Sequence, residues 1–276
     1  MTDGSLFGAG DVIVMDSEYM RVSSVAGNEL TVSRGFAGTT GATHAQNAVV
    51  TILTNAQEEN AGPEALATAK SEQHNYTQIF IRPVDVSRTM QRVRSTEGNE
   101  LEYQVTKQAL ELALDIERAL LRGKAAAGSD STARALAGLD TWIASETQNA
   151  QGALSLSEFN AFLRGIWENG GNPDVLLCDG LFLSVIHEWN VGSLMVTPSD
   201  RIGGVRVTQW VSPFGVFTIL PDRQAGSGTC YALTSRELAL AVIDDVHYQE
   251  MAKTSDGSRG QVVAELTLEC ANERFH

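Results

Sequence analysis

The chain has 276 residues, of which 43% are hydrophobic and 20% are charged, a composition typical of a folded globular protein. It contains 20 basic and 34 acidic side chains, and the net charge of −14 disfavours a function driven by attraction to phosphate backbones. No apolar run approaches the about 18 residues that a membrane span needs, and the first residues lack the basic and apolar regions of a secretory signal.

The first segments of the chain are short, strand-like and separated by polar turns. We expect strands at residues 12–15, 19–22, 30–33 and 48–53, with a turn at Gly27-Asn28. Several short strands with turn signals predict a small all-β unit over residues 1–54. Residues 55–75 are polar and show little periodicity, so they are expected to be a linker or an exposed loop.

An extended segment leads into the longest predicted helix. Residues 75–93 are expected to be extended, and Pro83 favours a sheet edge because proline cannot donate a hydrogen bond to a neighbouring strand. A helix is predicted for residues 96–122 because apolar side chains recur at steps of four and three, namely Leu101, Val105, Ala109, Leu112, Ile116 and Leu120. A second stripe (Leu110, Leu114 and Leu121) widens this face, which predicts a central scaffold helix ending at Gly123.

The rest of the chain mixes helices and strands. Ser155 and Glu158 form a capping-box pattern, which predicts that a helix begins there. A buried strand is expected at residues 174–179 and a helix at residues 181–189, while the C-terminal third is expected to be mostly strands. This order predicts an α+β fold.

No pattern in the sequence indicates catalysis. Nucleotide-binding and nucleophile-elbow motifs are absent, and Val191 stands where a zincin motif starting at His187 would need its second histidine. The three cysteines, Cys178, Cys230 and Cys270, are far apart and form no C-x-x-C pair, so buried reduced thiols are expected rather than disulfides or a zinc site. The sequence therefore predicts no catalytic residue, metal or cofactor.

Four arginines cluster in and after the extended segment: Arg82, Arg88, Arg92 and Arg94. No aromatic side chains lie between them to stack on bases, which disfavours nucleic-acid binding. We expect them to be exposed on a strand edge, where they are solvated or contact another subunit. Separately, His44 is expected to organise the loop that contains Arg34 by a hydrogen bond rather than to act in catalysis.

Four stretches occur in a recognisable order. They are residues 10–22 with RGFAGTT at 34–40 and His44, YTQIF and VSRT at 76–80 and 86–89, DIERALLRG at 115–123, and MAKTSDG at 251–257 with ELTLE at 265–269. The motif Arg-Gly-x-x-Gly-Thr is a weak signal alone, but the combination covers nearly the whole chain. In this combination the chain resembles the tailed-bacteriophage major capsid (major head) proteins, which have the Hong Kong 97-type fold.

The resemblance implies a division of the chain into parts with separate roles. Residues 1–54 are the small β insertion, residues 76–134 form an extended β loop arm and the spine helix of a peripheral domain, residues 135–240 form an axial domain, and residues 241–276 return to the peripheral domain. Members of the family begin with a longer segment that includes an arm across neighbouring subunits. This chain starts almost directly in the β unit, so the resemblance does not extend to that arm.

The resemblance also implies a structural protein of the virion that is not an enzyme. It would assemble in the host cytoplasm, as hexamers and pentamers, into an icosahedral head around double-stranded DNA that it does not bind sequence-specifically. The implied partners are other copies of the chain and portal, scaffold and decoration proteins, with no membrane. Two alternatives are an encapsulin-like compartment shell and a soluble enzyme whose site would combine Cys178, Asp179 and His187.

Overall fold

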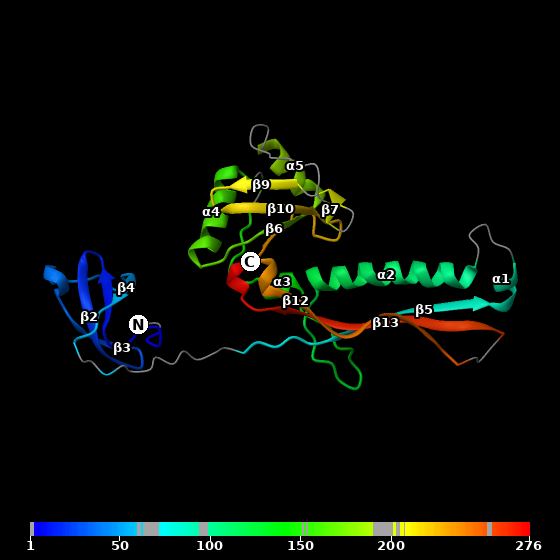
Figure 1. The fold of residues 1–276 in the computed structure, drawn as a ribbon, viewed down its shortest axis with the longest axis horizontal. Coiled ribbons are helices and arrows are strands. Elements are labelled where there is room, and N and C mark those ends of the chain that lie inside the picture. Colours follow the sequence, from blue (N-terminus) through cyan, green and yellow to red (C-terminus); the bar gives the residue numbers. More distant parts are fainter. Residues whose placement is uncertain are drawn as a thin grey trace. The chain divides into compact units, whose positions relative to one another are not determined.

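The computed structural model describes residues 3–59, 62, 72–93, 99–150, 152, 154–189, 201–202, 205–206, 208–252 and 256–276. The chain divides into two compact units, Met1–Gln73 and His74–His276 (Figure 1). Arg94, residues 96–98 of the predicted scaffold helix and most of the predicted linker lie outside the described residues. None of the described helices is both long enough and apolar enough to cross a membrane.

The first unit is a four-stranded antiparallel sheet with the order β3-β2-β1-β4. Its elements are β1 (Asp11–Met15), β2 (Glu18–Ala26), β3 (Glu29–Ser33), a 3-10 turn (Phe36–Gly38) and β4 (Val50–Asn55). Its core consists of Ile13 on β1, Met20 and Val22 on β2, and Phe7, which precedes β1. The strands predicted from the turn signals are confirmed, with β4 two residues later than expected.

The second unit begins with a long three-stranded antiparallel sheet and one long helix. The sheet order is β12-β13-β5, with β5 at Gln78–Ser87, β12 at Leu238–Glu250 and β13 at Gly257–Cys270. Helix α2 (Glu100–Arg122) runs along one face of this sheet (Figure 1). Side chains from the strands and the helix form a shared core, which includes Phe80, Val84, Leu112, Val262 and Ala264. The predicted scaffold helix and the edge position of Pro83 are confirmed. The wide covered face is not, because Leu110 and Leu114 of the predicted second stripe are 65% and 39% exposed.

Two boundaries differ from the prediction. Residues expected to be extended form a short helix, α1 (Arg88–Arg92), because the Ser87 side chain caps it by accepting a hydrogen bond from the Met90 N–H at 3.4 Å. Helix α2 begins at Glu100 rather than residue 96, since Asn99 has an extended backbone and its side chain accepts from the Leu101 N–H at 3.2 Å. In both cases a capping side chain sets the boundary, while the apolar stripe alone does not.

A second, mixed sheet lies in the middle of the sequence, with the order β11-β6-β10-β9. Its elements are β6 (Val175–Cys178), β9 (Thr208–Ser212), β10 (Gly215–Pro221) and β11 (Cys230–Leu233), of which only β6 and β10 pair in parallel. Helices α4 (Leu156–Glu168) and α5 (Gly180–Trp189) contribute to its core through Phe159, Leu163 and Ile186. The capping box of Ser155 and Glu158 at the start of α4 is confirmed.

A third cluster joins the two parts of this unit. It contains Leu121 from α2, Leu139 from α3 (Leu139–Trp142), Tyr231 and Leu233 from β11, and Leu268 from β13. The described chain also includes the short pair β7 (Arg201–Ile202) and β8 (Val205–Arg206) and the 3-10 turns at Ser235–Glu237 and Glu273–Phe275. The long sheet with α2 and the second sheet are therefore connected by buried apolar contacts.

Candidate subunit-contact surface

The long sheet of the second unit has one face covered by α2, and no described helix covers the other face. The covered face holds every second residue of β5, and the residues between them point away from the helix. Ile79 and Ile81 lie on this outer face and are 50% and 51% exposed. Large exposed apolar side chains that lie next to one another are typical of a surface that another protein covers.

Strand β12 forms one edge of the same sheet and is exposed along most of its length. We call its exposed apolar residues the β12 edge; they are Leu240, Val242, Ile243 and Val246, between 43% and 65% exposed. An edge strand offers unpaired backbone N–H and C=O groups, and proteins usually protect such edges with charges, prolines or a covering segment. The β12 edge combines a free strand edge with apolar side chains, so it is well suited to contact another chain.

Arg82 is not exposed in the way that the sequence suggested. It follows the alternation of Phe80 and Val84, so it lies on the face of β5 that packs against α2. Its guanidinium forms an ion pair with Asp115 on the helix, with Nε 2.8 Å from Oδ2, and lies 3.8 Å from Glu111. The prediction considered the clustering of the arginines and missed the strand alternation, which directs Arg82 toward its own chain.

Arg88 and Arg92 lie in α1, which directly follows β5. Arg88 Nε is 3.0 Å from Asp256 Oδ1, and both side chains are more than half exposed. Arg92 is exposed in the last turn of α1, while Arg94 is outside the described residues. The structure thus separates the predicted set: Arg82 lies against α2, and Arg88 and Arg92 remain on the surface.

A buried carboxylate organises the loop after β3. Glu18 is 1% exposed and accepts hydrogen bonds from the Arg34 guanidinium and from the backbone N–H groups of Gly35 at 3.2 Å and Ala42 at 2.9 Å. The loop turns at Gly35, whose φ of 66° favours glycine. The hydrogen bond from Arg34 is the main cause, and the one from Ala42 the second cause, that hold the pKa of Glu18 far below its usual range.

His44 completes this network. Its Nδ1 lies 2.8 Å from Asp16 Oδ2, and its Nε2 lies 2.9 Å from Glu18 Oε2. An ionised carboxylate only accepts hydrogen bonds, so these two contacts favour an imidazole that carries a proton on each ring nitrogen. The hydrogen bonds to Asp16 and then to Glu18 raise the pKa of His44. The predicted loop-organising role is confirmed, although the sequence did not indicate that Glu18 links His44 to Arg34.

The structure also places the residues of the alternative enzyme site. Asp179 caps α5, because its Oδ1 accepts a hydrogen bond from the Phe182 N–H at 2.8 Å. Its Oδ2 accepts a second hydrogen bond from the Gly228 N–H at 2.8 Å. Burial raises the pKa of Asp179, but these hydrogen bonds outweigh burial, so the pKa is lowered overall. Cys178 is fully buried, and His187 lies exposed on α5. In the described part of the chain, these positions favour structural roles over a shared catalytic site.

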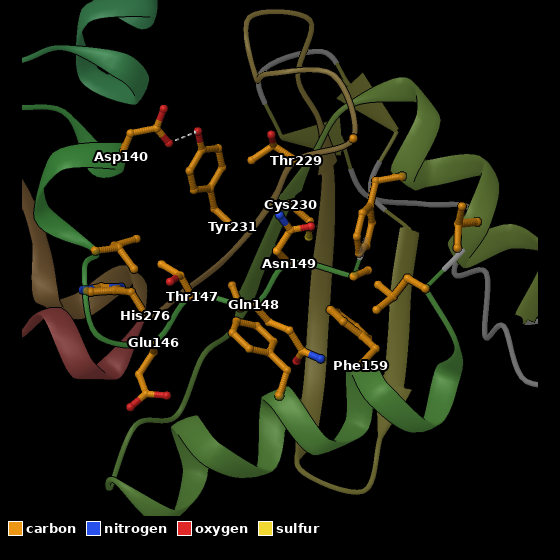
Figure 2. Close-up of a pocket in the computed structure, with 18 of the residues that line it drawn as sticks. Asp140, Glu146, Thr147, Gln148, Asn149, Phe159, Thr229, Cys230, Tyr231 and His276 are labelled. Carbon is orange, nitrogen blue, oxygen red and sulfur yellow. Dashed lines mark hydrogen bonds between the residues drawn. The ribbon is translucent and has the colours of Figure 1, made fainter. Parts of the chain in front are cut away.

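A cavity of about 550 Å³ lies between β11, α4 and the segment that follows α3 (Figure 2). Its walls include the aromatic rings of Phe159, Phe162 and Phe182, and Cys230 also lines it. At one end the Tyr231 hydroxyl donates to Asp140 Oδ1 at 2.7 Å. Among the described residues there is no group of three or more His, Cys, Asp or Glu side chains that could hold a metal ion.

The comparison with protein families decides what kind of protein this surface belongs to. Residues 11–276 match the model of the SU10 major capsid protein family. The chain belongs to this family. It is a shell-forming phage capsid subunit, and capsid proteins of this kind assemble as many copies in the virion. Family membership therefore suggests a structural role for the protein.

Solved structures similar to this capsid subunit are distant in sequence. The holo-SrpI encapsulin complex from Synechococcus elongatus PCC 7942 has 10% identity and a TM-score of 0.51, over 97% of this chain and 80% of that chain. The capsid of an empty GTA particle has 10% identity and a TM-score of 0.49, over 78% of each chain. The satellite phage P4 procapsid has 11% identity and a TM-score of 0.47, over 85% of this chain and 80% of that chain.

At 10% identity, the likeness to the encapsulin shows the fold alone, a mixed α and β fold that also builds compartment shells. No curated protein sequence matches the capsid subunit. The assignment to a phage shell therefore depends on the family match over residues 11–276.

Proposed function

We propose that this capsid subunit has the Hong Kong 97-type organisation. In this proposal residues 76–134 and 241–276 form the peripheral domain, residues 135–240 form the axial domain, and residues 1–54 form the insertion unit. The shared core of α2, β5 and β13 supports the joining of the first and last of these segments. The separate core of the second sheet supports an axial domain with its own packing.

In the proposed shell, copies associate as hexamers and pentamers through the outer sheet face, the β12 edge and the tip that bears Arg88 and Arg92. The single observation that carries this proposal is β12, a strand of 13 residues at a sheet edge with apolar side chains in water. Covering it with another copy removes apolar surface from water and pairs a free strand edge.

The proposed shell encloses double-stranded DNA without sequence-specific binding and is completed in the host cytoplasm with portal, scaffold and decoration proteins. The net charge of −14 supports this proposal because an acidic subunit attracts DNA weakly. Weak attraction lets packaged DNA move along the inner surface of the shell.

Negative-stain microscopy and sedimentation of the purified full-length chain test the proposal. We expect rings or closed shells, either from the chain alone or after co-expression with the scaffold protein of its own phage. A chain that stays monomeric under both conditions would contradict the proposal.

An encapsulin-like compartment shell is the second candidate, and the fold match over 97% of the chain favours it. The contents of native particles distinguish the two functions. A phage head protects genome-length double-stranded DNA from nuclease, whereas a compartment shell yields a stoichiometric protein cargo and no protected DNA.

A further inference from the structure

The sheet of the second unit brings together two cysteines that are far apart in the sequence. Cys178 on β6 and Cys230 on β11 are direct cross-strand partners, and their Sγ atoms lie 2.9 Å apart. Sequence patterns do not pair these cysteines, because they are 52 positions apart and their contact depends on the register of two strands. The third thiol, Cys270, lies on β13 and is not part of this pair.

The position of this pair within the strand ladder suits a disulfide. The Asp179 N–H donates to the Thr229 carbonyl at 3.2 Å, which makes the neighbouring positions a hydrogen-bonded pair. Pairs alternate along antiparallel strands, so Cys178 and Cys230 form a non-hydrogen-bonded pair, whose Cα atoms are about 4.5 Å apart. Disulfides span Cα separations of about 4.4–6.8 Å, so an S–S bond needs no strand movement.

Access to the pair comes through the cavity. Cys178 is fully buried, whereas Cys230 lines the cavity of about 550 Å³ (Figure 2). That volume admits a small oxidant. The pKa of the Cys230 thiol is raised, mainly by burial and to a smaller extent by its contact with Cys178. Because the thiolate is the reactive form, we expect oxidation to be slow at neutral pH and faster at higher pH.

We propose that Cys178 and Cys230 are an oxidative modification site at which a hydroperoxide converts the two thiols into a disulfide. Hydrogen peroxide first oxidises one thiol to a sulfenic acid, breaking the O–O bond and releasing one water. The second sulfur then attacks the first, and the S–S bond forms as a second water leaves. The thiols lose two electrons and two protons in all, and one peroxide is reduced to two waters.

The disulfide would fix β11 to β6 and close a loop of 52 residues. Closing such a loop restricts the unfolded chain, so the oxidised subunit is more stable than the reduced one. Thiols stay reduced in the cytosol and oxidise outside cells. The timing, reduced during assembly and oxidised in released particles, rests on the proposed function, whereas the chemistry of the pair does not.

Peroxide treatment of the folded, full-length chain tests the proposal. The protein is incubated with hydrogen peroxide, alkylated under denaturing conditions and digested without reductant. We expect loss of two titratable thiols, a mass lower by about two hydrogens and one linked peptide pair containing Cys178 and Cys230. The melting temperature should rise by about 5–10 °C and return to its starting value after dithiothreitol treatment.

Matched variants assign the effect to the pair. Cys270→Ala should keep the peroxide-induced stabilisation, whereas Cys178→Ala and Cys230→Ala should each abolish it. Three alkylated thiols after peroxide treatment of the wild type would overturn the proposal, as would a linkage through Cys270 or sulfinic acid at Cys230 as the main product. These readouts use the isolated chain, so they are independent of whether it assembles into shells.

Discussion

At the residue scale, Arg82 and Arg88 differ because Arg82 lies within strand β5, whereas Arg88 is the first residue of helix α1. Arg82 lies on the covered face of β5 and pairs with Asp115 in the spine helix. Arg88 pairs with Asp256 at the tip, where the two side chains are 61% and 67% exposed. An exposed pair contributes little to folding because water screens it. We therefore expect folding effects at Arg82 and assembly effects at Arg88.

Charge reversal distinguishes these two roles. Arg82→Glu places a carboxylate beside Asp115 and Glu111 and should lower the free energy of unfolding by about 1 kcal/mol. Arg88→Glu should change it by less than about 0.5 kcal/mol while reducing the assembled fraction. Urea unfolding and sedimentation measure the two quantities. An Arg82→Glu protein with wild-type stability and no assembly would instead indicate that Arg82 contacts a neighbouring subunit.

The His44 network predicts a pH dependence in the first unit. Its hydrogen bonds to Asp16 and Glu18 raise the folded-state pKa of His44 above that of the unfolded chain. The stabilisation is therefore complete below the unfolded-state pKa of about 6.5 and is lost as the pH rises through the folded-state value. Hydrogen exchange at the Ala42 amide, which donates to Glu18, should accelerate across that interval.

His44→Gln should remove this pH dependence, because glutamine does not titrate. His247→Gln, a substitution on β12 in the other unit, is the matched control and should leave exchange at Ala42 unchanged. An NMR titration in which His44 deprotonates at or below a pH of about 6.5 would contradict the charged assignment.

Sequence reasoning at this scale identified residue types better than their partners. His44 and Arg34 were connected correctly with one loop, because they lie close together in the sequence. Glu18 was missed because it precedes Arg34 by 16 positions and reaches it only through the pairing of β2 with β3. The contact of Cys178 with Cys230 depends on register in the same way.

At the element scale, α2 is the part that the sequence predicted most fully. Its apolar stripe follows from helical geometry alone and includes Leu112, which is fully buried against the sheet. Leu110, two positions earlier, points away from the sheet and is 65% exposed. The same helix therefore provides two leucines of equal size and propensity in opposite environments.

These two leucines allow a matched test of core packing. Leu112→Ala should lower the free energy of unfolding by about 2–5 kcal/mol, because it removes buried methyl groups and leaves a cavity. Leu110→Ala should change it by less than about 0.5 kcal/mol, as expected for an exposed position. Equal effects of the two substitutions in urea unfolding would show that the assigned helix faces are wrong.

At the scale of the whole molecule, the long sheet is formed by strands that are far apart in the sequence. Strand β5 pairs with β13 from Ser87 opposite Gly257 to Gln78 opposite Leu266. Both segments were predicted to be extended, but such local patterns carry no information about a strand's partner or register. The resemblance to capsid proteins supplied that long-range order, since it placed residues 76–134 and 241–276 in one domain. The β12 edge followed only from the sheet order.

The last prediction concerns this edge. Ile243→Lys combined with Val246→Lys places two charges among side chains that are already exposed, so folding should be retained. If another copy covers β12, the same charges are buried without partners, and assembly should fall about tenfold or more. Electron microscopy and sedimentation of the double variant measure the assembled fraction, and circular dichroism checks the fold.

Ser157→Lys on α4 serves as a control because it adds a charge at an exposed position outside the long sheet. Wild-type assembly of the β12 double variant would exclude this edge from the subunit contacts. Loss of assembly in the β12 variant alone would separate an interface effect from a general effect of added charge. If only the β12 variant loses assembly, the exposed apolar side chains of β12 serve assembly. Exposed side chains add little to the stability of the isolated subunit.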